Sequence, residues 1–401
     1  MRLRVKDFTT KVGSGVTPRG GAETYLEQGI PLFRSQNVYD NGFLMDDIAY
    51  ISEEVDESMS GTRVKPGDVL LNITGASIGR CFYTSDSFER GNVNQHVCII
   101  RPKKNITSPS FLHYCIISNE GQEQINLSQT GANREGLSVE DIKGFSFDIP
   151  TLSVQQKMVD YLDEKTSVID TQVELLEKKK DAYTRLKKAM INRAVTRGLD
   201  ENVKLKDSGV EWIGMIPEHW TMGRFKDVYN KSNVGESIDK EYCTDNETDF
   251  LFYTAGIIPI HTDFEEFPQW KYTNRNDLLL ARNGTPYVYL PKCNSVYSDH
   301  IIRVDIKKSF CREYVRFCLQ QAISTEIVDS VSITTWSISI WNKQLMPFPP
   351  FSEQQSIAAY LDEKCTKIDA AIANIDKQTD ALKRLKRSLI NEVISGKRMI
   401  E

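Results

Sequence analysis

Apolar side chains recur at every seventh residue along two stretches of this 401-residue chain, and the spacing predicts two long amphipathic helices. A more polar companion seam is expected beside each, through Lys165, Gln172, Lys179 and Leu186 and through Lys364, Ala371, Gln378 and Leu385. An antiparallel two-helix coiled coil fits this pattern, and a long helix packed only on its own domain is the alternative. The apolar seams are Leu162, Ile169, Leu176, Tyr183 and Met190, and Leu361, Ile368, Ile375, Leu382 and Leu389.

Both helices have recognisable starts and ends. A proline precedes each one, and Ser153 or Ser352 then offers an N-cap oxygen, with Gln156 or Gln355 three residues later at the capping-box position. Gly198 and Gly396 stand where a left-handed residue closes a helix.

The two helices are copies of one sequence. Of the 38 positions from 155 to 192, 17 are identical to the residue 199 positions later, beginning with the pair Gln155-Gln156. The segments before the two copies share little. The chain therefore predicts a scaffold that carries two different globular domains.

Each globular segment predicts a mixture of strands and helices. Apolar, β-branched runs begin at Asp68 and Gln95 in the first segment and at Asp277 and Asp299 in the second, and an amphipathic stretch follows each pair. The two segments are therefore expected to share one fold, which makes the chain an α+β tandem repeat with pseudo-twofold symmetry. The predicted boundaries are 1–148 and 201–347 for the globular domains, and 149–200 and 348–401 for the helices.

Composition narrows the class of protein. No apolar run reaches the ~18–20 residues of a membrane span, and the start of the chain lacks a secretory signal. Eight scattered cysteines without a Cys-x-x-Cys pair predict reduced thiols in a cytoplasm. The net charge of −5 neither suggests nor excludes nucleic-acid binding, because local clustering sets the field.

Motifs for catalysis are missing from the sequence. There is no P-loop and no dinucleotide fingerprint, and Pro347-Phe-Pro-Pro-Phe351 only resembles a methyltransferase loop, with Phe348 at the position that needs a polar residue. Asp163-Glu-Lys165 and Asp362-Glu-Lys364 resemble half of a nuclease metal site but lack a further converging acid. The five histidines have no metal-ligand spacing, so we expect no metal and no catalytic residue.

Chemistry suited to DNA is better represented. Arg, Asn and Gln pair with base edges, whereas Ser, Thr and backbone amides bind phosphates. The basic C-terminal halves of the helices, 178–197 and 377–398, either complement the helix dipole or contact phosphate or an acidic partner. Candidate DNA contacts in the loops are Thr17, Arg19, Arg34, Gln36, Asn37, Thr74, Ser77, Arg80, Asn94, Gln95, His96, Asn133 and Arg134, and Thr254, Arg282, Asn283, Thr285, Ser298, His300, Thr334, Thr335 and Trp336.

Both helices begin Pro-x-x-x-x-Gln-Gln and continue through Tyr-Leu-Asp-Glu-Lys and Ile-Asp, and Trp212-Ile-Gly-Met-Ile-Pro-Glu-His-Trp220 leads into the second globular domain. Together these residues resemble the specificity subunits of type I restriction–modification systems. The resemblance covers the whole chain. It implies two target recognition domains that read a bipartite, asymmetric DNA site, joined by an antiparallel coiled coil.

The resemblance also implies that the chain itself is not an enzyme. Two methyltransferase subunits would dock on the helices, and two restriction–translocase subunits would join through them. S-adenosylmethionine, ATP and Mg would be bound by those partners, and the assembly would defend against phage. A self-contained methyltransferase or nuclease and a coiled-coil adaptor without DNA are the rival hypotheses.

Overall fold

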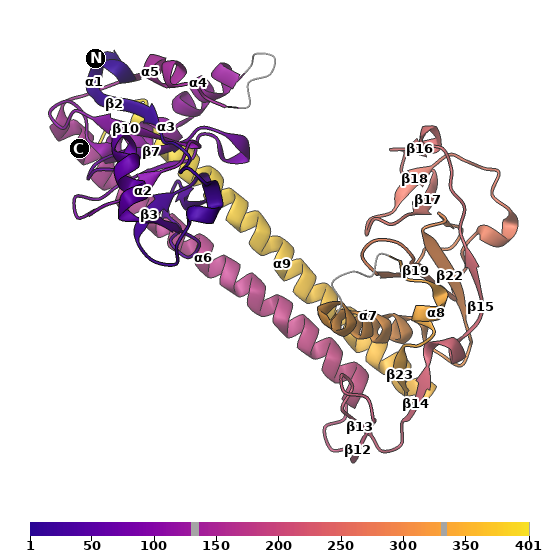
Figure 1. Cartoon of the computed structure of the whole chain (residues 1–401). Coiled ribbons are helices and arrows are strands. Elements are labelled where there is room, and N and C mark those ends of the chain that lie inside the picture. The colour runs from indigo at the N-terminus through magenta and orange to yellow at the C-terminus, as the bar shows by residue number, and fades with distance from the viewer. Residues whose placement is uncertain (130–135, 330–334, 401) are drawn as a thin grey trace. The chain divides into compact units, whose positions relative to one another are not determined.

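The computed structural model describes residues 1–129, 136–329 and 335–400, and only the backbone of 324–329. The chain divides into two compact units, Met1–Glu177 with Lys377–Glu401 (unit 1) and Lys178–Asp376 (unit 2). Helices α6 (Leu152–Arg197) and α9 (Phe351–Ile394) belong to both, so each unit holds one globular domain and one end of each long helix (Figure 1).

The globular part of unit 1, domain 1, contains two main sheets. The first has the order β2 (Thr9–Ser14), β10 (Val97–Pro102), β7 (Val69–Asn72) and β8 (Cys81–Tyr83). The second has the order β6 (Ala49–Ile51), β3 (Ile30–Phe33) and β9 (Asn92–Val93), in which β3 and β9 are parallel. The smaller elements are β1 (Arg2–Arg4) paired with β11 (Ser146–Asp148), β4 (Val38–Tyr39) paired with β5 (Gly42–Phe43), and helices α1 (Val5–Phe8), α2 (Glu53–Ser58), α3 (Pro109–Ile117), α4 (Asn119–Gln129) and α5 (Val139–Gly144).

The globular part of unit 2, domain 2, repeats this topology. Its first sheet is β15 (Tyr229–Val234), β22 (Ile301–Ile306), β19 (Asp277–Ala281) and β20 (Val288–Tyr289). Its second contains β18 (Ile260–Thr262), β17 (Phe250–Tyr253) and β21 (Val296–Tyr297), again with one parallel pair, and adds β16 (Cys243–Thr244). The prediction that both segments share one fold is confirmed. The other elements are the pairs β12 (Leu205–Asp207) with β13 (Met215–Pro217) and β14 (Thr221–Arg224) with β23 (Leu345–Phe348), and helices α7 (Arg312–Asp329) and α8 (Ile338–Trp341).

The central strands are apolar throughout because both of their faces are covered. In β7, Val69 and Leu71 join the core under α3 and the long helices, whereas Leu70 faces a second core that includes Phe33 and Val38. The strands β19 and β22 divide between two cores in the same way. A strand buried on both sides shows a continuous hydrophobic run rather than alternation.

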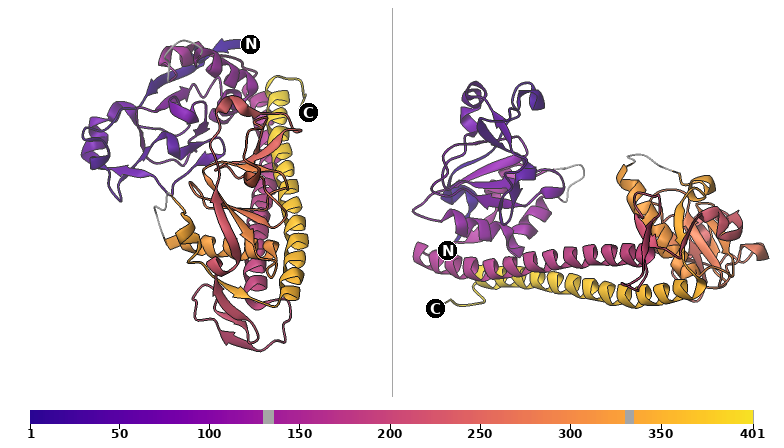
Figure 2. Two further views of the ribbon diagram at one scale, coloured as in Figure 1. Left: turned by 90° about the vertical axis from the view of Figure 1, so that its right-hand side faces the viewer. Right: turned by 90° about the horizontal axis from the view of Figure 1, so that it is seen from below.

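Within each unit the two long helices lie side by side and antiparallel (Figures 1 and 2). In unit 1, Leu162 shares a core with Leu389, and in unit 2 Leu361 shares one with Val195. Lys386 Nζ lies 2.6 Å from Asp170 in unit 1, and Lys187 Nζ lies 2.6 Å from Asp369 in unit 2. Asp369 and Lys386 are the repeat equivalents of Asp170 and Lys187, 199 residues later in the chain. The duplicated sequence therefore makes the same interhelical ion pair twice.

The predicted companion seam is wrong by one residue. Leu186 and Leu385 are 54% and 55% exposed, whereas Thr166 and Cys365 are buried. Starting from Leu162, the inward positions advance by four residues and then three, not three and then four. One apolar residue in every seven does not determine whether the companion position lies three or four residues further on. Packing against the globular domain determines it. The observed companion positions are Thr166, Val173, Lys180 and Lys187, and Cys365, Ile372, Thr379 and Lys386.

The predicted capping boxes are also wrong. Helix α6 begins at Leu152 and α9 at Phe351, so Ser153 and Ser352 lie inside the first turn. The first glutamine of each pair has the structural role. Gln155 is fully buried, and its Nε2 donates to Pro150 O at 2.9 Å, while Gln354 Nε2 donates to Pro349 O at 2.9 Å.

Candidate nucleic-acid interface

The turn between β9 and β10 brings four predicted contact residues of domain 1 into one hydrogen-bonded chain. The Thr17 hydroxyl donates to Gln95 Oε1, and Gln95 Nε2 lies 2.9 Å from His96 Nε2. His96 Nδ1 lies 2.6 Å from Thr74 Oγ1. If the Gln95 amide donates, His96 is the Nδ1–H tautomer and donates to Thr74. Residues from three separate loops are thus fixed at one end of the domain.

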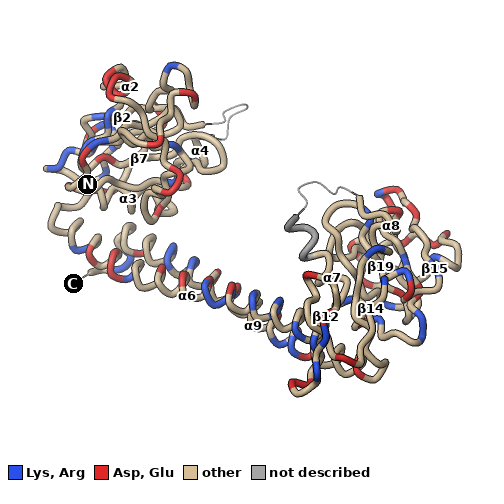
Figure 3. Tube along the Cα trace, turned by 60° about the horizontal axis from the view of Figure 1, so that its bottom comes forward, with Lys and Arg blue, Asp and Glu red and all other residues tan. Residues whose placement is uncertain are grey.

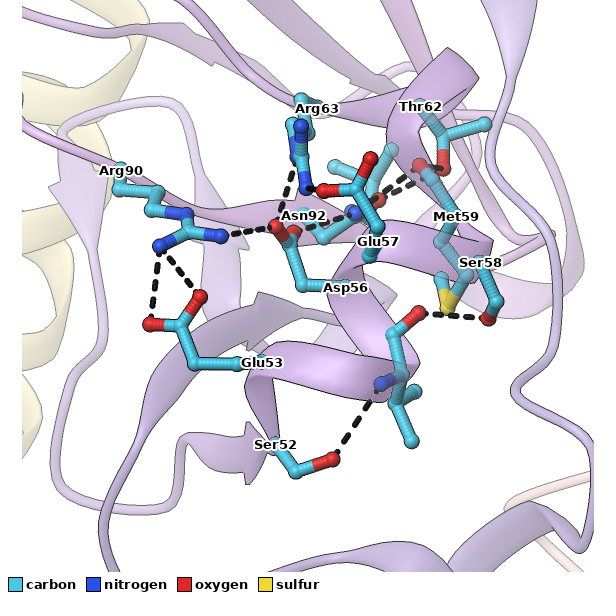
Figure 4. Close-up of polar contacts among 12 residues, drawn as sticks. Ser52, Glu53, Asp56, Glu57, Ser58, Met59, Thr62, Arg63, Arg90 and Asn92 are labelled. Atoms are coloured by element: carbon cyan, nitrogen blue, oxygen red, sulfur yellow. Dashed lines mark hydrogen bonds and ion pairs between the residues drawn. The ribbon is translucent and has the colours of Figure 1, made fainter.

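A buried carboxylate holds the strand that leads into this turn (Figure 4). Asp56 on α2 is inaccessible to solvent and accepts hydrogen bonds from Arg63 Nε and Arg90 Nη2, both at 2.6 Å. It also accepts from Asn92 Nδ2 of β9 at 2.9 Å. Burial alone would raise the pKa of Asp56, but the hydrogen bonds from Asn92, Arg90 and Arg63 outweigh it and lower the pKa.

The equivalent turn of domain 2, between β21 and β22, places a second histidine in the same setting. Asn283 Nδ2 lies 2.7 Å from His300 Nδ1. With the amide as donor, His300 accepts at Nδ1 and carries its proton on Nε2, which stands 4.0 Å from Asp299 Oδ1, beyond hydrogen-bond distance. The Arg282 amide donates to His300 O at 2.8 Å, as the Ile73 amide does to His96 O at 3.0 Å.

Two glycines allow the chain to pass close to these turns. A Cβ on Gly15 would lie 2.1 Å from Val93 O, and one on Gly235 would lie 2.1 Å from Tyr297 O and Ser298 O. Real Cβ atoms do not approach backbone oxygens this closely. Glycine is therefore required at the same place in both domains for steric reasons.

Some of the residues predicted to contact DNA are buried and hydrogen-bond to the backbone of their own loops. Asn94 Oδ1 accepts from the His96 amide at 3.1 Å and Ser298 Oγ from the His300 amide at 3.3 Å, and both side chains are buried. Asn37 is also buried, and its Nδ2 donates to Leu44 O at 3.0 Å. These three side chains shape loops, so the prediction that they contact DNA requires correction.

The loop after β3 uses two further predicted contacts internally. Arg34 Nη2 donates to Asp47 O at 2.7 Å, and the Gln36 amide donates to the Asp47 carboxylate.

Between β7 and β8, the predicted contact Arg80 remains exposed. Its guanidinium stacks 5.0 Å from the centre of the Tyr39 ring.

Trp336 is not available to a ligand, and the prediction of a DNA contact there is wrong. Its indole is 1% exposed and packs against Trp341 in the core of unit 2. Asn133, Arg134 and Thr334 lie outside the described residues. The predicted contacts that remain at least partly exposed are Thr17, Arg19, Arg34, Gln36, Thr74, Ser77, Arg80, Gln95, His96, Thr254, Arg282, Asn283, Thr285, His300 and Thr335.

Comparison with known proteins identifies the family. The family model for the type I restriction modification DNA specificity domain matches residues 3–182 and 217–384. The chain belongs to this family of DNA specificity subunits. It is 22% identical to the type I restriction enzyme EcoKI specificity subunit of Escherichia coli K12, over 94% of this chain and 86% of that protein. It is 21% identical to the MjaVIII specificity subunit of Methanocaldococcus jannaschii, over 98% and 92%.

Solved structures agree on the fold of this specificity subunit. A chain from a structure of a type I restriction–modification system matches with a TM-score of 0.73 at 14% identity, covering 98% of this chain and 97% of that one. The HsdS subunit of Thermoanaerobacter tengcongensis matches with a TM-score of 0.51 at 15% identity, covering 99% and 97%. The predicted family and fold class are therefore confirmed.

The repeated Asp-Glu-Lys triplets of the specificity subunit have a structural role. Asp163 Oδ1 accepts the Tyr114 hydroxyl at 2.6 Å, and Asp362 Oδ1 accepts Arg316 Nη2 at 3.0 Å, so each triplet ties a long helix to its own globular domain. Among the described residues, no group of three or more His, Cys, Asp or Glu is placed to hold a metal ion. In that same part of the chain, no helix is long and apolar enough to cross a membrane.

Several basic side chains of the long helices pair with the opposite helix. Acidic and basic positions are interspersed along α6 and α9 (Figure 3). Besides Lys187 and Lys386, Lys180 Nζ lies 2.6 Å from Asp376 and Lys383 Nζ lies 3.5 Å from Glu177. Interhelical pairing is a role that sequence reasoning did not consider for these lysines.

Exposed aliphatic residues also occur in the loops, and the polar residue types that predict DNA contacts do not reveal them. Ile257 and Ile258 are 60% and 80% exposed, and Leu44 and Met45 are 41% and 47% exposed. Leu44 and Met45 precede two aspartates, and that break in composition was an available signal, whereas Ile257 and Ile258 lie in a largely apolar loop that gives no such signal.

Proposed function

We propose that this specificity subunit reads a bipartite, asymmetric double-stranded DNA site, with domain 1 and domain 2 each reading one half. The paired helices hold the two domains and dock two methyltransferase subunits, through which two restriction–translocase subunits join. The chain is not itself catalytic, and S-adenosylmethionine, ATP and Mg are bound by the partners. The eight free cysteines suit a cytoplasmic location.

One observation carries this proposal: the same turn occurs twice on the same backbone with different side chains. His96 and His300 occupy equivalent places, but their neighbours are Thr74 and Gln95 in one domain and Asn283 and Asp299 in the other. A common frame with different hydrogen-bonding groups suits two domains that recognise different base sequences.

Exchange of one domain tests independent reading. Replacing residues 1–148 with the matching domain of a related subunit should change one half-site and leave the other unchanged. Mapping methylated adenines in host DNA, with and without the exchange, measures both half-sites and the gap. Changes in both half-sites would contradict independent reading, and methylation that persists without this chain would contradict a role in specificity.

Lengthening the helices tests whether they set the gap. One heptad inserted after Glu177 and one after Asp376 would add about 10 Å of helix, equivalent to about 3 base pairs of duplex. The half-site sequences should stay the same and the gap should lengthen by about that amount. An unchanged gap would show that the helices are not the spacer.

Two assays address the rival functions. The isolated chain should neither methylate nor cut duplex DNA, whereas a self-contained enzyme would do so. Gel shifts on the mapped site, with the methyltransferase partner present, should show specific binding, whereas a coiled-coil adaptor without a DNA role would show none.

A further inference from the structure

Each globular domain exposes two adjacent aliphatic side chains on the same connection. In domain 2 they are Ile257 and Ile258, between β17 and β18, and in domain 1 they are Leu44 and Met45, between β3 and β6. A single exposed aliphatic residue on a surface is ordinary. An adjacent pair at equivalent places in two domains, on loops of different length and sequence, calls for a ligand with an apolar group.

These loops start beside the histidine turns. The Ser298 amide donates to Tyr253 O, the last residue of β17, at 2.9 Å, and the Asn94 amide donates to Phe33 O, the last residue of β3, at 3.1 Å. The chain therefore leaves each strand next to Asn94–His96 or Ser298–His300. The loops that carry the aliphatic pairs therefore begin at the end of each domain where the hydrogen-bonding groups lie.

Buried polar side chains hold the backbone of both loops. In domain 2 the Tyr289 hydroxyl donates to Gly256 O at 2.9 Å and lies 3.3 Å from Thr254 O. Burial raises the pKa of Tyr289 to about 12, so this hydroxyl keeps its proton. In domain 1 the Asn37 amide donates to Leu44 O at 3.0 Å and to Asp47 O at 3.2 Å. A loop fixed in this way can present an aliphatic group without a large ordering cost on binding.

The chemistry of the duplex suggests what these side chains meet. The major-groove edges of the bases offer hydrogen-bonding groups and one apolar group, the 5-methyl of thymine. Side chains such as Asn283 and His300 supply the hydrogen bonds, and the neighbouring aliphatic pair supplies an apolar surface. We propose that Ile257–Ile258 and Leu44–Met45 recognise thymine methyl groups, one set in each half-site. This inference rests on the proposed DNA-reading function.

The test pairs a change in the protein with a change in one DNA methyl group. The complex of the full chain with its methyltransferase partner is titrated with the mapped site, in which thymines are replaced one at a time by deoxyuridine. For the wild-type chain, one replacement in the half-site of domain 2 should weaken binding about fourfold, the effect of about 0.8 kcal/mol for one methyl-sized group.

With Ile258→Ser, that same replacement should have no further effect, and replacements in the other half-site should act as before. Leu44→Ser should give the reciprocal result in the half-site of domain 1. Leu205→Ser is the matched control, since Leu205 is also exposed (38%) but lies on the hairpin β12–β13, which is separate from the two sheets of domain 2. It should bind like the wild type.

Three outcomes would overturn the proposal: no deoxyuridine effect for the wild-type chain in either half-site, equal deoxyuridine effects in wild type and Ile258→Ser, or loss of methyltransferase assembly in Ile258→Ser without a deoxyuridine effect. The last result would assign the pair to a protein interface. Failure of the wild-type complex to bind the mapped site would instead refute the proposed function, so the two failures are distinguishable.

Discussion

Substitution of Gln155 by leucine should weaken the attachment of α6 to domain 1. The Gln155 side chain is fully buried and makes four hydrogen bonds. Its Oε1 accepts from the Ser108 amide at 2.9 Å and the Thr107 hydroxyl at 3.2 Å, and its Nε2 donates to Ile106 O at 2.8 Å and Pro150 O at 2.9 Å. Leucine preserves most of the volume and removes all four bonds.

The cost follows from the groups left behind. A buried group without its partner costs about 1–3 kcal/mol, and three backbone groups lose a partner here. We expect Gln155→Leu to lower the free energy of unfolding of unit 1 by about 3–6 kcal/mol, comparable with the ~5–15 kcal/mol total of a typical domain. Gln354 bonds to the Cys311 amide and Pro349 O, both at 2.9 Å, so two backbone groups lose a partner and Gln354→Leu should cost unit 2 about two thirds as much.

Hydrogen exchange followed by mass spectrometry can separate the two units. Gln155→Leu should speed exchange in β10 and α3 and leave β22 and α7 unchanged, and Gln354→Leu should do the reverse. Gln156→Leu is the control, because Gln156 is exposed and bonds only locally, to Asp160 at 2.8 Å. Equal effects of Gln155→Leu and Gln156→Leu on domain 1 would refute the reasoning.

Three further substitutions test other parts of the structure. Asp56→Asn should destabilise unit 1 by about 2–3 kcal/mol at pH 7, less than the loss for a fully buried pair because both arginines are partly exposed. Since the folded pKa of Asp56 is lowered, its contribution is complete above the unfolded value of ~3.9 and lost as pH falls through the folded pKa. In urea unfolding, the difference in free energy of unfolding between Asp56→Asn and wild type should shrink as the pH falls, and a difference independent of pH would contradict the lowered pKa of Asp56. Gly15→Ala should cost about 1–3 kcal/mol, whereas Gly13→Ala, where a Cβ meets nothing within 4 Å, should be nearly neutral; equal thermal shifts would contradict the steric argument. Leu361→Ala should cost unit 2 about 3–5 kcal/mol by denaturant unfolding, whereas Leu385→Ala should cost unit 1 under about 0.5, and a comparably large loss for Leu385→Ala would restore the companion seam predicted from sequence.

The candidate site was only partly predictable, because several of its polar residues are buried and stabilise the loop backbone. Asn94 and Ser298 suit base recognition by composition, yet both are buried and accept from the histidine amides two residues later. Trp336 was selected from a polar loop, but the fold places it in a core beside Trp341. Residue type alone does not reveal whether a side chain faces solvent or backbone, because that depends on segments distant in sequence.

The sequence by itself determined the long helices, their duplication and the central strands, since heptad spacing, a repeat of 199 residues and β-branched runs are local patterns. It did not determine which side of each helix forms the companion seam. That choice depends on contacts across the pair, such as Lys187 with Asp369, and on the globular domain that covers the helix. Likewise, only the folded chain brings Asn283 to His300 and Thr74 to His96, because side chains 17 and 22 residues apart meet through the pairing of separate strands.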